Sequence, residues 1–295
     1  MTELHVATWG DGEPVLFVHG SFVRGGASWA GQRPLADRYR LLLVDRRGYG
    51  DSPPTNGEDF DRDADDLAEL LGDGAHLVGH SYGAVASLLA AGRRPGAVRS
   101  LVVIEPPAFQ LAPRSPAAQA MRQRIAAVFA GAANLTPEAF YPAFLQAMGY
   151  DLETLGLRAW SDLGAGLRPD SVAAIRTSMH QRMPWDAEVR VDVLAAASFP
   201  KLVVSGGWDT ASPATRATAG AALQDVCDVL AKRIGAERAV IPGAFHSPQS
   251  AQPAAFNACL AAFLSSVRVR TPASVATRRT PPAGARRSRR PSRRP

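Results

Sequence analysis

The sequence predicts an α/β protein that has a doubly wound, mostly parallel sheet and an inserted all-helical segment. Two observations lead to this fold class. Short apolar runs alternate with stretches of helical periodicity along most of the chain, as expected for a parallel sheet covered by helices on both faces. Between Ala108 and Phe199 this alternation stops, and helical periodicities follow one another. We therefore expect a sheet domain that is interrupted by a helical cap.

The expected strands are mostly short, continuous apolar runs. Such runs are typical of strands that are buried on both faces, since neither face then needs polar side chains. The strands are expected at Pro14–Val18, Leu41–Val44, Ala75–Val78, Leu101–Ile104, Lys201–Val204 and Glu237–Ile241.

The expected helices of the sheet domain place apolar residues on one side, as Phe256, Leu260 and Phe263 do in the last of them. In the inserted segment, one helix is expected around Met121 and Ile125 and a second around Phe140 and Phe144. A third is expected from Asp170 to Met183. The helices expected outside the insertion are Trp29–Ala36, Asp59–Leu71, Tyr82–Ala91 and Ala251–Leu264.

Composition divides the chain into a sheet domain (residues 1–107 and 198–266), a helical cap (108–197) and a tail (267–295). The formal net charge is +6, but the tail contains ten Arg and no Asp or Glu, so the remainder carries 6 − 10 = −4. The tail is rich in Arg, Pro and Ser and is expected to be disordered. A nucleic-acid partner is not favoured, because the only basic segment is this tail, whose favoured interpretation is a solvated extension.

The rest of the composition favours a soluble, cytoplasmic protein, either a monomer or a homodimer. No apolar run approaches the roughly 20 residues that span a bilayer, and the N-terminus lacks the basic start and apolar centre of a secretory signal. Cys227 and Cys259 form no metal-ligand spacing, so a reduced pair is favoured over a disulfide.

The stretch LVGHSYG, residues 77–83, places Ser81 between two glycines, directly after an apolar run and before a run of small residues. A sharp turn from a strand into a helix requires such glycines, because a side chain there would clash with neighbouring backbone. This turn would expose the hydroxyl of Ser81 above the sheet. Ser81 is therefore the candidate nucleophile.

Three further motifs follow strands in the order that serine hydrolysis needs. HGSF, residues 19–22, could direct backbone N–H groups at an oxyanion, together with the N–H of Tyr82. LVVSGGWD ends in the carboxylate of Asp209, and IPGAFH ends in the imidazole of His246. An imidazole can take a proton from serine and return it to a leaving group.

Together with DRRGYGDS, residues 45–52, these motifs resemble the α/β-hydrolase-fold superfamily, over roughly residues 12–266. The resemblance is to capped members of the broad group that includes small esterases and cofactor-free haloperoxidase-like hydrolases. It implies a triad of Ser81, His246 and Asp209, with the amides of Ser21 and Tyr82 as the oxyanion hole. Glu105 competes with Asp209, because some relatives place the acid after the strand equivalent to 101–104. No metal or organic cofactor is implied.

In relatives of this fold, a helical insertion at this point covers the nucleophile. The cap is therefore expected to supply an apolar roof for a small-molecule substrate, although several of its side chains must pack helix against helix. The expected substrate is a neutral, mostly apolar ester, lactone or thioester. The candidate roof residues are Met121, Phe129, Phe140, Phe144, Met148, Met179 and Trp185, and Phe22 joins them from the HGSF motif.

Alternatives remain open from the sequence. The same triad serves acyl transfer, perhydrolysis or cleavage of a carbon–carbon bond. The fold could also act as a ligand receptor derived from a hydrolase, because fold alone does not settle function.

Overall fold

A seven-stranded sheet forms the centre of the molecule. The structure is a computed structural model that describes residues 3–267. The strand order is β1-β3-β2-β4-β5-β6-β7, in which β1 is antiparallel to β3 and the other neighbours are parallel. The predicted fold class is confirmed. The strands are β1 Val6–Trp9, β2 Glu13–Val18, β3 Tyr39–Val44, β4 Ala75–His80, β5 Val98–Ile104, β6 Lys201–Gly206 and β7 Glu237–Ile241.

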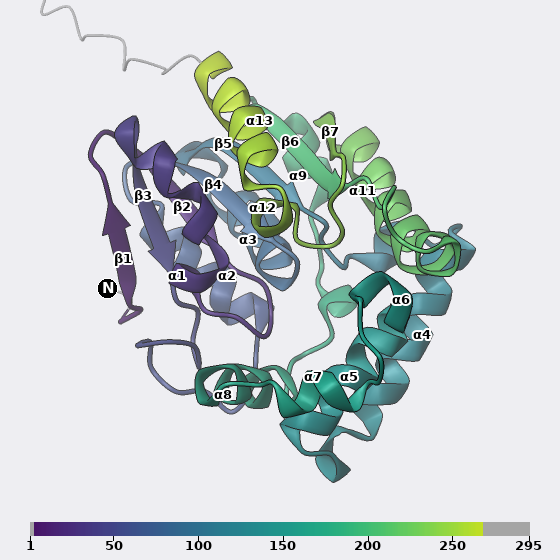
Figure 1. The fold of residues 1–295 in the computed structure, drawn as a ribbon. Coiled ribbons are helices and arrows are strands. Elements are labelled where there is room, and N and C mark those ends of the chain that lie inside the picture. The colour runs from purple at the N-terminus through teal and green to yellow at the C-terminus, as the bar shows by residue number, and fades with distance from the viewer. Residues whose placement is uncertain (1–2, 268–295) are drawn as a thin grey trace, which may run out of the picture.

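Helices cover both faces of the sheet, which explains the continuous apolar runs. In β2, Leu16 and Val18 pack into one core with α2, α3 and α11, while Val15 and Phe17 pack into a second core with Trp29 and α13. Figure 1 shows α13 and α3 on opposite sides of the sheet. Because β2 to β7 run parallel, their carboxyl ends lie at the same end of the sheet, where the loops that follow several strands meet.

Two helices differ from expectation. The segment expected at Trp29–Ala36 is a 3-10 helix, η1, which contains Pro34, and proline cannot donate the N–H bond of an α-helix interior. The helix expected to reach Met183 ends at Ser178. The helices outside the cap are α1 Gly25–Ser28, η1 Ala30–Asp37, α2 Phe60–Leu70, α3 Tyr82–Arg93, η2 Pro95–Ala97, α10 Pro213–Thr215, the π-helix η6 Arg216–Gly220, α11 Ala221–Ile234, α12 Pro248–Ala251 and α13 Pro253–Ser266.

The segment between β5 and β6 is helical in its regular elements, and α4 to α8 gather at one side of the sheet in Figure 1. The cap boundaries at 108 and 197 stay a prediction. The expected disorder of the tail concerns residues that, from 268 onward, lie outside the described part of the chain. The elements of this segment are η3 Phe109–Leu111, α4 Pro116–Ala130, η4 Ala132–Asn134, α5 Pro137–Met148, α6 Leu152–Leu155, α7 Ser161–Ala165, α8 Pro169–Ser178, η5 Pro184–Asp186 and α9 Val191–Ala196.

Within residues 3–267, none of the helices combines the length and the apolar character that crossing a membrane requires.

Candidate active site

Ser81 occupies a sharp turn between the end of β4 and the start of α3. Its φ of 53° lies in the left-handed region that a residue with a side chain rarely adopts. A Cβ added at Gly83 would lie 2.2 Å from the carbonyl oxygen of His19, and one added at Gly79 would lie 2.4 Å from Oγ of Ser87. The two glycines therefore let neighbouring backbone close around the turn.

His246 comes from the loop after β7 and reaches Ser81 across the edge of the sheet. Its Nε2 lies 2.9 Å from Oγ of Ser81, and its Nδ1 lies 2.8 Å from Oε2 of Glu105. When Nδ1 carries the proton, it donates to Glu105, and Nε2 is left free to accept the hydroxyl proton of Ser81. Serine, imidazole and carboxylate thus form one hydrogen-bonded line.

Glu105 is the carboxylate of this line, and it directly follows β5. Its side chain is fully buried. Oε1 accepts hydrogen bonds from the backbone N–H of Gly206 and from the indole Nε1 of Trp208, both at 2.9 Å. Oε2 is left for His246. A buried carboxylate is costly unless donors surround it, and here three donors do so.

Asp209 does not contact the histidine, so the expectation that it orients His246 is wrong. Asp209 is exposed, and its Oδ1 accepts the N–H of Gly243 at 2.8 Å. The chain after β6 turns at Trp208, whose φ is 57°. That turn puts the indole against Glu105 and leaves Asp209 outside, where it fastens the loop that follows β7.

The amides of Ser21 and Tyr82 were expected to form the oxyanion hole. Among residues 3–267, no hydrogen-bond acceptor is recorded for either N–H group. Tyr82 is the first residue of the 12-residue helix α3, whose N-terminus favours negative charge. Both amides are thus available for a ligand, and their role as an oxyanion hole stays a prediction.

Backbone strain is concentrated around this site. Among the described residues, Phe22, Ser81, Glu105 and Trp208 are the non-glycine residues with positive φ. Each follows a different strand of the sheet, and each touches the serine–histidine–carboxylate line, takes part in it or adjoins the cavity above it. Such conformations cost about 1–3 kcal/mol each and persist where surrounding structure enforces them, which is common at functional sites.

A cavity of about 560 Å³ lies over Ser81 and His246. Among the described residues that line it, none is Lys, Arg, Asp or Glu. The lining residues that sequence analysis expected are Phe22, Met121, Phe144, Met148 and Trp185.

Three expected roof residues do not line this cavity. Phe129, Phe140 and Met179 pack together with Ile175 in a cluster inside the cap. Phe140 is fully buried and Met179 is nearly so. They pack one cap helix against another, because amphipathic helices need a buried face before any ligand arrives.

Sequence analysis missed several residues that line the cavity, among them Tyr150 and Gln181. Tyr150 follows α5 and Gln181 follows α8. Both lie in turns, where helical periodicity provides no signal.

Two other histidines, His80 and His19, lie near Ser81, and burial disfavours the protonated form of both. Burial, followed by the charge of His246, lowers the pKa of His80 to about 3, and its Nε2 lies 2.8 Å from the carbonyl oxygen of His246. Burial and the neighbouring charge of Arg46 hold the pKa of His19 well below its ordinary value. Both rings are therefore neutral near pH 7, and His80 holds the loop that carries His246.

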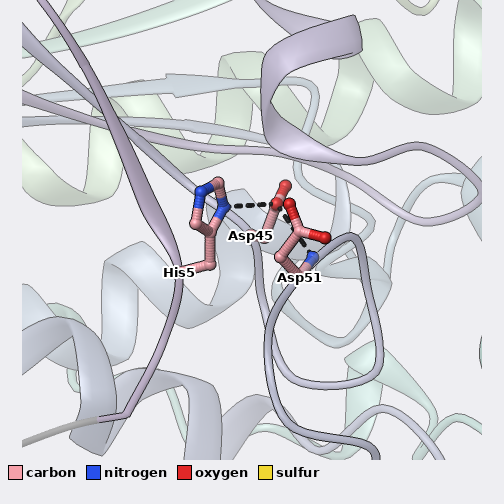
Figure 2. A group of neighbouring side chains, drawn as sticks. All are labelled: His5, Asp45 and Asp51. Carbon is pink, nitrogen blue, oxygen red and sulfur yellow. Dashed lines mark hydrogen bonds and ion pairs between the residues drawn. The ribbon is translucent and has the colours of Figure 1, made fainter.

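A group of three side chains elsewhere has the composition of a metal site. Figure 2 shows His5 and Asp51 near Asp45. Oδ1 of Asp45 accepts the N–H of Gly25 at 2.8 Å, while its Oδ2 contacts Nδ1 of His5 at 2.9 Å and the N–H of Asp51 at 3.4 Å. Protein donors thus already use both oxygens of the central carboxylate, and the group anchors the loop that follows β3.

Comparison with known proteins places this architecture among hydrolases. A model of the family described as "Alpha/beta hydrolase family" matches residues 15–259. A pimeloyl-[acyl-carrier protein] methyl ester esterase of Aeromonas salmonicida is 30% identical over 213 residues, which cover 70% of this chain and 82% of that protein.

Two further similarities differ in their extent. The non-heme chloroperoxidase CPO-A1 of Kitasatospora aureofaciens is 39% identical over 124 residues, which cover 39% of this chain and only 45% of that protein. A thermophilic esterase of Thermogutta terrifontis, solved with malate bound, superposes with a TM-score of 0.63 at 25% identity, over 90% of this chain and 93% of that one.

Proposed function

Because this chain belongs to the alpha/beta hydrolase family, we propose that it is a serine esterase that uses Ser81, His246 and Glu105. The observation that carries the proposal is the pair of hydrogen bonds that His246 makes, 2.9 Å to Ser81 and 2.8 Å to Glu105. The esterase names of two similar proteins support ester hydrolysis.

In the first half of the proposed reaction, Oγ of Ser81 attacks the ester carbonyl carbon while Nε2 of His246 takes the hydroxyl proton. The negative charge that develops on the carbonyl oxygen is stabilised by the N–H groups of Ser21 and Tyr82. Glu105 holds the imidazole in the required tautomer and stabilises its cation. His246 then gives the proton to the leaving alcohol as the carbon–oxygen bond breaks.

In the second half, water attacks the acyl group on Ser81. His246 takes a proton from this water, and the second tetrahedral intermediate collapses to release the carboxylic acid. The same proton returns to Oγ of Ser81, so the enzyme ends as it began. Apart from the ester and water, both halves use only groups of this chain.

The substrate class follows from the cavity. Within residues 3–267, no Lys, Arg, Asp or Glu lines it, and much of its wall is made apolar by Met121, Phe144, Met148 and Trp185. An ionised group placed there would lose its hydration without gaining a counter-charge. We expect neutral, medium-sized esters or lactones to react best. Thioester cleavage, acyl transfer, perhydrolysis and carbon–carbon cleavage stay predictions for the same triad.

The first test is covalent labelling. A fluorophosphonate should add one equivalent to the wild-type protein by intact mass, with the adduct mapped to Ser81, and Ser81→Ala should take up none. Labelling at another residue, or of the variant, would contradict the assignment.

The second test is turnover of matched esters. The kcat/KM for 4-nitrophenyl hexanoate should be about 100-fold higher than that for mono-4-nitrophenyl adipate. The adipate ester ends in a carboxylate, whose unpaired charge would be buried in the cavity. The kcat/KM for the hexanoate should also be higher than that for 4-nitrophenyl acetate, because a longer acyl chain fills more of the cavity. A preference for the anionic ester would reject the substrate class. Labelling without turnover of any ester would favour the receptor alternative.

A further inference from the structure

A buried carboxylate lies behind the loop that carries the candidate oxyanion donor. This loop, residues 19–22, is called the oxyanion loop below. The side chain of Glu58 is fully buried, and its Oε2 accepts the hydroxyl of Ser21 and Nη2 of Arg46, each at 3.0 Å. Its Oε1 accepts the hydroxyl of Tyr49. Glu58 is therefore bound directly to one residue of the oxyanion loop.

A second connection runs from Glu58 to the next residue of the loop through two hydroxyl groups. The N–H of Phe22 donates to Oγ of Ser178 at 3.0 Å, and Oγ of Ser178 lies 2.7 Å from the hydroxyl oxygen of Tyr49. Tyr49 has one hydroxyl proton, which it gives to Glu58, so its oxygen accepts from Ser178. The serine proton is shared with the carbonyl oxygen of Ala174, at 3.1 Å.

In each of these hydrogen bonds, the donor therefore lies on the Phe22 side and the acceptor on the Glu58 side. Hydrogen bonds in such a row polarise one another and end here on a negative charge. Burial and the charge of Glu58 hold the pKa of Tyr49 well above its ordinary value. The tyrosine consequently remains protonated near neutral pH, as its hydrogen bond to Glu58 requires.

The oxyanion loop needs such support. Phe22 has a φ of 69°, a conformation that persists only where its surroundings enforce it. The loop is also pressed against the nucleophile, since a Cβ added at Gly20 would lie 2.9 Å from Cβ of Ser81. Arg46 holds the other end of the loop by donating to the carbonyl oxygens of His19 and Gly20, each at 3.0 Å. A small shift of the loop would move the N–H of Ser21 relative to Ser81.

Ser178 belongs to α8, in the segment inserted between β5 and β6, whereas the other members of the row come from the sheet domain. The adjacent Thr177 also joins this segment to the sheet domain, because its Oγ1 donates to the carbonyl oxygen of Gly48 at 2.9 Å. No recorded bond of Thr177 goes to the oxyanion loop. The two neighbours thus make similar contacts with different targets.

We propose that Ser178 and Tyr49 are positioning residues for the oxyanion hole: they connect Glu58 to the N–H of Phe22 and thereby hold the N–H of Ser21 where the oxyanion forms. The inference rests on the proposed esterase function. It makes a residue of the inserted helical segment part of the support for catalysis, in addition to any role of that segment in covering the substrate.

The test compares Ser178→Ala with the matched control Thr177→Ala. For each variant, kcat and KM are measured on 4-nitrophenyl hexanoate, together with the inhibition constant of phenylboronic acid, which forms a tetrahedral adduct with an active-site serine, and the melting temperature. Ser178→Ala should lower kcat by about 10- to 100-fold and change KM by less than about threefold, because the lost geometry matters mainly in the transition state. The boronic acid should bind more weakly by a comparable factor.

Thr177→Ala should change kcat and boronic acid binding by less than about twofold, although it also removes one bond between α8 and the sheet domain. Equal kcat values for the two variants would overturn the inference, as would a raised KM with unchanged kcat and unchanged boronic acid binding.

Tyr49→Phe provides an independent test in case Ser178→Ala does not fold. It keeps the ring that packs against His19 and Arg46 and removes only the hydroxyl, so it should lower kcat and boronic acid affinity in the same way. Wild-type values for Tyr49→Phe would reject the proposal. Failure of the esterase function itself would be distinct, because the wild-type protein would then show neither turnover nor a Ser81 adduct.

Discussion

The molecule contains the same three residue types, serine, histidine and glutamate, at two places in the sheet. One group is Ser81, His246 and Glu105. In the other, Nδ1 of His76 lies 2.7 Å from Oγ of Ser100, and Nε2 of His76 lies 3.4 Å from a carboxylate oxygen of Glu13. We call these the upper group and the lower group.

Their surroundings differ in every respect that matters for chemistry. Ser81 occupies a strained turn at the start of a helix and lines the large cavity. Ser100 lies within β5 and, like His76 within β4, is fully buried. Neither lines that cavity. In the lower group a buried hydroxyl pairs with a buried imidazole, whereas the upper group exposes a nucleophile to a ligand. Residue types alone therefore do not identify the site.

The largest expected effect separates the two serines. Ser81→Ala should lower kcat/KM for 4-nitrophenyl hexanoate by about 10⁴-fold or more, because no other group can form the acyl-enzyme. Ser100→Ala should keep activity within about threefold and reduce the free energy of unfolding by about 1–2 kcal/mol, since it removes the partner of a buried histidine. Steady-state kinetics and urea unfolding check both values. Substantial activity in Ser81→Ala would remove the basis of the comparison.

A smaller effect concerns the donors around the carboxylate of the upper group. Trp208→Phe removes the indole donor from Oε1 of Glu105 and should lower kcat/KM by about tenfold, because the carboxylate is then held only by Gly206 and His246.

Trp29→Phe is the matched control, since Trp29 is also fully buried and its indole nitrogen has no recorded partner. It should leave kcat/KM within about twofold. If both tryptophan variants lose the same activity, the loss reflects packing and not the bond to Glu105.

The smallest effect concerns pH and the lower group. Burial lowers the pKa of His76 in the folded protein, so the unfolded chain binds its proton at a higher pH, near the ordinary value of about 6.5. Its contribution to stability is therefore complete above about pH 6.5 and is lost as the pH falls below it, by up to about 1.4 kcal/mol per pH unit for one proton.

His76→Asn should accordingly make the free energy of unfolding less dependent on pH between about 6.5 and 5, as measured by urea titration at several pH values, while esterase activity remains. An unchanged pH dependence would show that His76 is not a proton-linked part of the lower group.

Much of the fold could be predicted because burial on both faces leaves a strong pattern in the sequence. The runs in β2 to β6 are continuous and apolar, and they were found. The edge strand β1, Val6–Trp9, was missed, since it is short and only partly buried, so its pattern is weak. In η1, the spacing of apolar residues favours an α-helix, whereas Pro34 disfavours one. The structure has a 3-10 helix there.

Less of the candidate site could be predicted. Glu105 and Asp209 both come shortly after a strand, and only the backbone turns at Glu105 and Trp208, with φ of 42° and 57°, decide which carboxylate faces His246. In the cap, helical periodicity identified apolar faces but could not separate Met179, which packs inside the cap, from Met121 and Met148, which line the cavity. Those outcomes depend on how the helices are placed in space.

The most direct test of the central claim is a side-by-side measurement of kcat/KM for Glu105→Gln and Asp209→Asn, with far-UV circular dichroism to show that both fold. Glu105→Gln should lose about 10³- to 10⁴-fold, because a neutral amide can neither hold His246 in the required tautomer nor stabilise its cation. Asp209→Asn should stay within about threefold, since that side chain only fastens Gly243. A crippled Asp209→Asn beside an active Glu105→Gln would contradict the account.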